Sequence, residues 1–164
     1  MKTLFLLRHA KASKDDPSLA DIKRPLTERG FSDARLMSEV LRQKNLVPEK
    51  IIASTAVRAY TTAFVFAAAL EKVSDDIELS DALYDSDTPD YFETISGISE
   101  SFSSCMLAGH NDTITMVAER LLGTYVESMK TCGVMIISSA ANSWTEFATS
   151  RCKLELSIYP SQFK

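Results

Sequence analysis

The alternation of hydrophobic and polar positions predicts short buried strands separated by helices along most of the chain. Five apolar runs have the length of a strand, and they cover residues 4–7, 50–54, 77–79, 105–109 and 133–139. Apolar residues at helical spacing recur in four segments, which are residues 27–45, 57–72, 89–102 and 113–122. Thr27 can cap the first of these helices, and Gly123 can terminate the last.

The end of the chain has a different pattern. The stretches "WTEFAT" (residues 144–149) and "KLELSIY" (residues 153–159) predict two further strands. Because strands alternate with helices before this strand-rich end, the sequence indicates an α/β fold, a three-layer α/β/α sandwich with a mostly parallel mixed sheet. A chain of 164 residues is long enough to build one core, so we expect a single domain over residues 1–164. Four aromatic side chains are expected in this core: Phe64, Phe66, Trp144 and Phe147.

The composition restricts the partners and the compartment of the protein. A net charge of -4 argues against a general binder of nucleic acid or of anionic membranes, so any anion site must be local. The scattered cysteines Cys105, Cys132 and Cys152 suggest neither a disulfide framework nor a metal site, which fits a reducing cytoplasm. The first apolar run is too short for a signal peptide, and no stretch approaches a membrane span. We therefore expect a cytoplasmic protein that needs no metal or other cofactor.

Candidate chemistry gathers in three short stretches, each directly after a predicted strand. They are "LLRHA" with Arg8 and His9, "ASTAVRA" with Arg58, and "LAGHND" with His110. Because the carboxyl ends of parallel strands meet along one edge of a sheet, we expect these residues to converge. Two arginines and two histidines in one place need a counter-anion, and guanidinium groups suit the bidentate recognition of phosphate. The sequence therefore predicts a phosphoryl-binding site.

Four ordered motifs, "LLRHAKA", "RPLTERG", "STAVRAYTTA" and "LAGHN", resemble those of the histidine phosphatase superfamily, and specifically its short phosphohistidine phosphatase branch, the SixA type. The resemblance extends over about residues 3–123. It implies a phosphoglycerate mutase-like fold without the large insertion that covers the site in phosphoglycerate mutases. Thr55 and Asp112 stand where many relatives have proline, and neither carries the chemistry. Within the second motif, Thr27 and Gly30 are interpreted as structural.

The resemblance implies a role for each residue of the site. His9 is expected to be the nucleophile that becomes a transient phosphohistidine, while Arg8, Arg58 and His110 bind the phosphoryl oxygens. The positive charges of the arginines favour the neutral imidazole, which is the form that can attack phosphorus. A backbone carbonyl is expected to orient His9 through its second ring nitrogen, and His110, if protonated, would add a donor.

A phosphoester substrate would also need an acid for its leaving oxygen. The segment "DALYDSD" offers Asp81, Asp85 and Asp87, and Asp85 best matches the place of the acid in larger relatives, although a solvated acidic loop is the alternative. A phosphohistidine depends less on such an acid, because imidazole leaves readily and can be protonated near neutral pH. Three more residues could line the rim of the site: Lys11, Ser13 and Arg24.

Three functions remain open from the sequence. The leading one is a metal-independent phosphatase that forms a phosphohistidine intermediate and acts on the phosphohistidine of a signalling protein. The second uses the same chemistry on a small phosphoester or a sugar phosphate, for which Asp85 would be essential. The third is a non-catalytic module that binds a phosphoprotein, and the presence of His9 argues against it. Neither a nucleic acid nor a membrane is expected as a partner.

Overall fold

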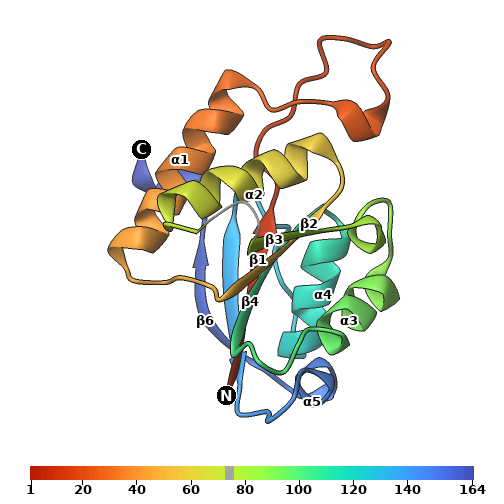
Figure 1. The fold of residues 1–164 in the computed structure, drawn as a ribbon, viewed down its shortest axis with the longest axis vertical. Helices are drawn as coiled ribbons and strands as arrows, with labels where there is room; N and C mark the ends of the chain where they lie inside the picture. The colour runs from red at the N-terminus through yellow and green to blue at the C-terminus, as the bar shows by residue number, and fades with distance from the viewer. Residues whose placement is uncertain (73–75) are drawn as a thin grey trace.

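A six-stranded mixed sheet runs through the molecule in the computed structural model, which describes residues 1–72 and 76–164 (Figure 1). The strand order is β3-β2-β4-β1-β5-β6. The strands are β1 Lys2–Arg8, β2 Lys50–Ser54, β3 Ile77–Ser80, β4 Ser104–Gly109, β5 Val134–Ser139 and β6 Lys153–Ile158. The first four pair in parallel, whereas β5 is antiparallel to both of its neighbours, β1 and β6. The predicted mixed and mostly parallel sheet is therefore confirmed.

Helices cover both faces of the sheet and form the outer layers of the sandwich (Figure 1). The α-helices are α1 Glu28–Gln43, α2 Val57–Ala69, α3 Thr88–Ser96, α4 Thr113–Leu122 and α5 Trp144–Thr149, and the short 3-10 helices are η1 Asp21–Lys23, η3 Asp81–Leu83 and η4 Pro160–Phe163. Helices α1 and α2 pack on one face of the sheet, and α3, α4 and α5 pack on the other. In β1, Phe5 and Leu7 belong to the first core and Leu4 and Leu6 to the second, as expected for a strand buried on both faces. No helix in the described part of the chain is long and apolar enough to cross a membrane.

The predicted helices are present, with differences at their ends. Thr27 caps α1, because its side-chain oxygen accepts a hydrogen bond from the N–H of Gly30 at 3.0 Å. Helix α4 ends before Gly123, as predicted. Helix α3 is shorter than the predicted segment 89–102 and ends just before Gly97, since glycine is a poor residue for the interior of a helix.

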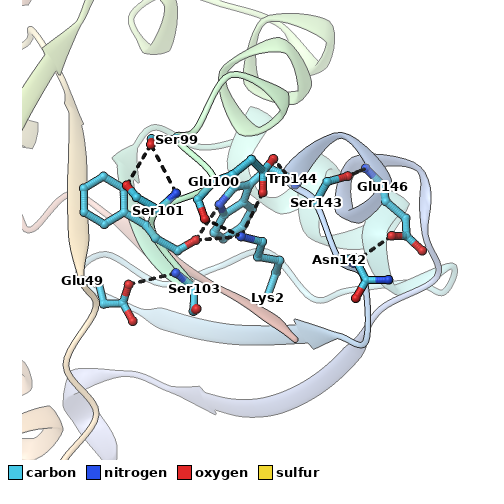
Figure 2. Close-up of polar contacts among 11 residues, drawn as sticks. Lys2, Glu49, Ser99, Glu100, Ser101, Ser103, Asn142, Ser143, Trp144 and Glu146 are labelled. Carbon is cyan, nitrogen blue, oxygen red and sulfur yellow. Dashed lines mark hydrogen bonds and ion pairs between the residues drawn. The ribbon is translucent and has the colours of Figure 1, made fainter.

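The strand predicted over residues 144–149 is wrong, because this stretch forms helix α5. Ser143 caps the helix by accepting a hydrogen bond from the N–H of Glu146 at 3.0 Å, and the Glu146 carboxylate accepts one from the N–H of Asn142 at 2.8 Å (Figure 2). These local side-chain contacts satisfy N–H groups at the start of a helix, and they outweigh a weak strand pattern. The strand predicted over residues 153–159 is confirmed as β6.

Polar contacts with buried partners hold α5 against the amino end of β1 (Figure 2). Trp144 is fully buried, and its indole N–H donates to the carbonyl of Phe102 at 3.0 Å. The ammonium of Lys2 donates to the same carbonyl at 2.9 Å, lies 5.3 Å from the centre of the Trp144 ring and pairs with Glu100 at 3.0 Å. This cluster lies at the Lys2 end of β1, opposite to the end that carries Arg8.

The prediction of an aromatic core holds for three residues of four. Phe66, Trp144 and Phe147 are fully buried. Phe64 is 38% exposed, so its placement in the core is wrong, and it packs edge-on against Tyr60 on the same helix, α2. A helix that lies on one face of a sheet leaves its outer side open to water, whatever residues stand there.

The long polar segment after β1 returns to the edge of the sheet where β1 ends. Ala12 and Leu26 form an antiparallel bridge, and the N–H of Thr27 donates to the carbonyl of Lys11 at 2.9 Å. A Cβ atom at position 30 would lie 2.3 Å from the Lys11 carbonyl oxygen, so only glycine fits there. Thr27 and Gly30 therefore have the structural roles that the sequence predicted, and together they keep this segment beside the strand ends.

Candidate active site

His9 is the first residue after β1, at the carboxyl edge of the parallel strands. Its backbone N–H donates to the carbonyl of Gly109 at 3.1 Å, which extends the pairing of β1 with β4. Its Nδ1 lies 2.8 Å from the carbonyl oxygen of Ala10. A carbonyl can only accept, so in the neutral ring Nδ1 carries the proton and Nε2 is bare. The predicted backbone carbonyl that orients His9 is confirmed.

The surroundings of His9 disfavour its protonated form. Burial is the main cause that lowers the pKa of His9 to about 4. The hydrogen bond to Ala10 opposes this shift, and the positive charges of Arg58, Arg8 and Arg24 add to it. Near pH 7 the ring is therefore neutral and has an unprotonated nitrogen.

His110 follows β4 directly, and its ring centre lies 5.2 Å from that of His9. Its backbone N–H donates to the hydroxyl of Tyr91 at 3.1 Å. A Cβ atom at the preceding residue, Gly109, would lie 2.0 Å from this hydroxyl, so the contact requires glycine. Burial, and then the charges of His9 and Arg58, lowers the pKa of His110 to about 3. His110 is therefore neutral near pH 7, and it is not the protonated donor that the sequence analysis considered.

Two guanidinium groups lie beside the histidines. Arg8, the last residue of β1, donates to the carbonyl of Met129 at 2.6 Å, and burial lowers its pKa. Arg58, in the first turn of α2, has a side chain that is only 9% exposed and donates to the backbone carbonyl of Asp21 at 2.8 Å. Both charges act on His9. The four residues predicted to converge from three strand ends therefore do so.

The counter-anion of this cationic cluster is Asp21, which the sequence analysis missed. Its carboxylate lies 3.0 Å from Nη2 of Arg58 and 3.4 Å from Nη1 of Arg24, and it accepts a hydrogen bond from the hydroxyl of Tyr84 at 2.8 Å. The hydrogen bond from Tyr84 is the largest cause of the lowered pKa of Asp21, so the carboxylate is ionised. Asp21 lies in a polar segment without periodicity, and no local pattern distinguishes it from its acidic neighbours.

Of the predicted rim residues, Arg24 is brought to the site. Its side chain is 22% exposed, and its charge contributes to the lowered pKa values of both His9 and His110. The backbone of Lys11 and Ser13 takes part in the internal pairing of the loop, through the Lys11 carbonyl and the Ser13 N–H.

A cavity of about 200 Å³ opens beside His110 and Arg58, and neither His9, Arg8 nor Arg24 is among the residues that line it. Its walls include Asp21, Arg58, Tyr84, Asp85, Tyr91 and His110. Among the three candidate acids, Asp85 lines this cavity, whereas Asp87 caps α3 and Asp81 begins η3. A larger cavity of about 460 Å³, beside β5 and β6, contains neither histidine and neither Arg8 nor Arg58. The chemistry therefore points to the smaller cavity.

The donors and charges gathered at this edge of the sheet, from Arg8, His9, Arg24, Arg58 and His110, suit an anion with several oxygens rather than a metal ion. Within residues 1–72 and 76–164, no three side chains of histidine, cysteine, aspartate or glutamate are grouped as a metal site would need. Three guanidinium groups instead offer N–H donors, and the His9 ring offers a bare nitrogen, because its own N–H already donates to the carbonyl of Ala10. The fold and the site thus define an α/β protein with three arginines beside a neutral histidine at the carboxyl edge of its sheet, an arrangement that suits a phosphoryl-like oxyanion.

The chain belongs to the histidine phosphatase superfamily. Residues 4–102 match the sequence profile of the histidine phosphatase superfamily (branch 1). An uncharacterized chloroplastic protein of Arabidopsis thaliana is 30% identical over 158 residues, which cover 91% of this chain and 72% of that protein. An uncharacterized protein of Mycobacterium leprae is 31% identical over 121 residues, which cover 72% of each chain.

Solved structures confirm the fold. A protein described as phosphohistidine phosphatase SixA from Agrobacterium tumefaciens is 27% identical, with a TM-score of 0.84 over 97% of this chain and 98% of that one. The protein histidine phosphatase SixA in complex with tungstate is 20% identical, with a TM-score of 0.85 over 99% of both chains. A mycobacterial glucosyl-3-phosphoglycerate phosphatase is 16% identical, with a TM-score of 0.72 over 95% of this chain and 98% of that one. The predicted phosphoglycerate mutase-like sandwich is therefore correct.

Proposed function

We propose that this protein is a phosphatase that hydrolyses phosphohistidine through a covalent phosphohistidine intermediate on His9. The observation that carries the proposal is the contact between Nδ1 of His9 and the carbonyl of Ala10 at 2.8 Å. It leaves Nε2 bare and fixes the plane of the ring beside the arginines, and a bare, oriented nitrogen is what a nucleophile requires. A site that only bound phosphate would gain nothing from this arrangement.

The reaction has two displacement steps at phosphorus. Nε2 of His9 forms a bond to phosphorus while the bond to the leaving imidazole breaks, and this imidazole keeps the electron pair and takes a proton from water. Arg8, Arg58 and Arg24 hold the equatorial oxygens. Water then attacks the phosphorus on His9, inorganic phosphate leaves, and Nε2 is bare again. No step calls for a metal ion.

The substrate class rests on three supports. One structural neighbour is described as phosphohistidine phosphatase SixA, and another is described as the protein histidine phosphatase SixA and was solved with tungstate, an oxyanion that resembles phosphate. The site consists of a small cavity at the sheet edge, which a histidine on the surface of a partner protein could reach. Imidazole also leaves with little help from an acid. We propose a phosphorylated signalling protein in the cytoplasm as the partner, and one domain over residues 1–164 as the functional unit.

A small phosphoester or sugar phosphate is the second candidate, because Asp85 lines the cavity and could protonate a leaving oxygen. Asp85→Asn separates the two substrates. If phosphohistidine is the substrate, the variant keeps most of its turnover of a phosphohistidine protein. If a phosphoester is the substrate, ester turnover falls by a factor of roughly 10²–10⁴, the usual contribution of a general acid. Asp87→Asn is the matched control, since Asp87 caps α3 and does not line the cavity.

The covalent intermediate is tested by intact-mass and acid-lability analysis after brief mixing with a phosphohistidine protein, with wild type compared with His9→Ala. An acid-labile phosphate adduct that is absent from His9→Ala supports the proposal. Turnover by His9→Ala at the wild-type rate contradicts it. Tight binding of tungstate by the wild type, with neither adduct nor turnover, would instead show a phosphoprotein-binding module.

A further inference from the structure

We infer that Ser54 is a positioning residue that holds His110 as its Nδ1–H tautomer, so that a neutral imidazole donates this N–H to the phosphoryl group. The inference rests on the proposed function for the identity of the anion, but the tautomer itself can be tested without any turnover. The contact that carries it is the distance of 2.8 Å between Oγ of Ser54 and Nε2 of His110.

The surroundings of Ser54 decide which atom of this pair donates. Ser54 ends β2 and is completely buried, and its oxygen already accepts a hydrogen bond from the N–H of Ala56 at 3.2 Å. A hydroxyl has one proton to donate and two lone pairs. If Nε2 of His110 carried the proton and donated it to Ser54, the serine hydroxyl would have two incoming donors and, among the residues that the structure describes, no acceptor for its own buried proton. A buried donor left in that way costs free energy.

The opposite assignment satisfies both atoms of the contact between Ser54 and His110. Ser54 donates its proton to a bare Nε2, and in the neutral ring the proton of His110 then resides on Nδ1. Nδ1 is buried and has no hydrogen-bond partner within residues 1–72 and 76–164. The N–H that this tautomer creates therefore needs an acceptor from outside the chain, and an anion oxygen is such an acceptor.

The order of the strands gives the direction of this N–H. Ser54 stands on β2, His110 follows β4 and His9 follows β1, and these strands are neighbours in the order β2-β4-β1. The two nitrogens of an imidazole point away from one another. With Nε2 directed toward β2, Nδ1 faces the β1 side, where the ring of His9 lies 5.2 Å away, centre to centre. The donor is thus aimed at the group that Nε2 of His9 would attack.

This geometry also explains how His110 can assist without a positive charge. An imidazolium donates from both nitrogens, whereas a neutral imidazole donates from one and must have the correct tautomer. Ser54 selects that tautomer in advance, so the donor is in place before the anion arrives.

The test is nitrogen-15 NMR of the imidazole rings at pH 7 on the uniformly labelled protein. The chain has only two histidines, so the spectrum of His9→Gln assigns the signals of His110 directly. We expect a bare Nε2 and a protonated Nδ1 in His110. In Ser54→Ala the ring should lose this preference, and in Ser54→Thr, which keeps the hydroxyl, it should retain it. Ser38→Ala is the matched control, because Ser38 is equally buried but bonds to Arg35 within α1.

Binding of tungstate gives the functional readout. Loss of one ordinary hydrogen bond should weaken tungstate binding about tenfold in Ser54→Ala, and leave Ser38→Ala unchanged. A proton on Nε2 of wild-type His110, or on both nitrogens, overturns the inference. So does a Ser54→Ala protein that folds normally and keeps the wild-type tautomer. Absence of turnover together with the expected tautomer would contradict the proposed phosphatase and leave this inference standing.

Discussion

Lowering the pH from 7 to 5 is expected to destabilise the folded protein strongly, because both of its histidines are buried in the neutral form. The pKa is lowered to about 4 for His9 and to about 3 for His110, whereas an unfolded histidine titrates near 6.5. At pH 5 the unfolded chain has taken up nearly two protons on these rings, and the folded protein has taken up almost none. Protons bound by the unfolded state alone shift the equilibrium toward unfolding.

The magnitude follows from these pKa values. Each ring contributes stability that is present above pH 6.5 and is lost as the pH falls toward the folded-state pKa. Between pH 7 and pH 5 the loss is about 2 kcal/mol for His9 and a similar amount for His110, so up to about 4 kcal/mol in total. A typical domain has only about 5–15 kcal/mol of unfolding free energy, so the effect is large enough to measure.

Urea unfolding at constant ionic strength measures this loss at pH 7, 6 and 5. The control is the double variant His9→Gln/His110→Gln, which keeps every carboxylate and therefore the acid dependence due to them. Between pH 7 and pH 5 the unfolding free energy of the wild type should fall by up to about 4 kcal/mol more than that of the double variant. If the unfolding free energy of the two proteins changed equally with pH in this range, the histidines would not be held neutral by burial, and the reasoning would be refuted.

Three further outcomes are expected. The rate of phosphoenzyme formation should fall only as the pH approaches the His9 pKa of about 4, and an acid limb near 6.5 would contradict a buried neutral nucleophile. Asp21→Asn should tighten tungstate binding roughly two- to fivefold, because it removes a half-exposed carboxylate that competes with the anion for Arg58. Tyr84→Phe keeps this carboxylate and is the control. Isothermal calorimetry on both variants decides whether Asp21 competes with tungstate for Arg58 or supports its binding. Gly109→Ala should lower the free energy of unfolding by about 1–3 kcal/mol, because the new Cβ atom would overlap the Tyr91 hydroxyl. Gly97→Ala, whose Cβ atom would lie 3.4 Å from its nearest neighbour, should change this free energy by less than about 0.5 kcal/mol. Equal effects of the two substitutions in urea unfolding would argue against the overlap.

The main elements and the convergence of the site could be predicted from the sequence because both depend on short-range patterns. Apolar runs marked the parallel strands, and Arg8, His9 and His110 stand directly at strand ends. Parallel strands bring such ends to one edge of a sheet whatever the details of packing. Where a pattern was weak, the prediction failed: residues 144–149 were expected to form a strand, but Trp144, Phe147 and Ala148 stand at helical spacing, and the caps at Ser143 and Glu146 support a helix.

The fold class and the placement of His9 and its neighbouring arginines at one edge of the sheet follow from patterns within the sequence. The other contacts of the site depend on tertiary packing. Asp21 meets Arg58 across 37 positions, and Ser54 meets His110 across 56. Such contacts depend on the path of loops and on the register between strands, and no local periodicity encodes them. The neutral state of His110 has the same origin, because burial by surrounding elements sets its pKa, and burial is a property of the whole packed molecule.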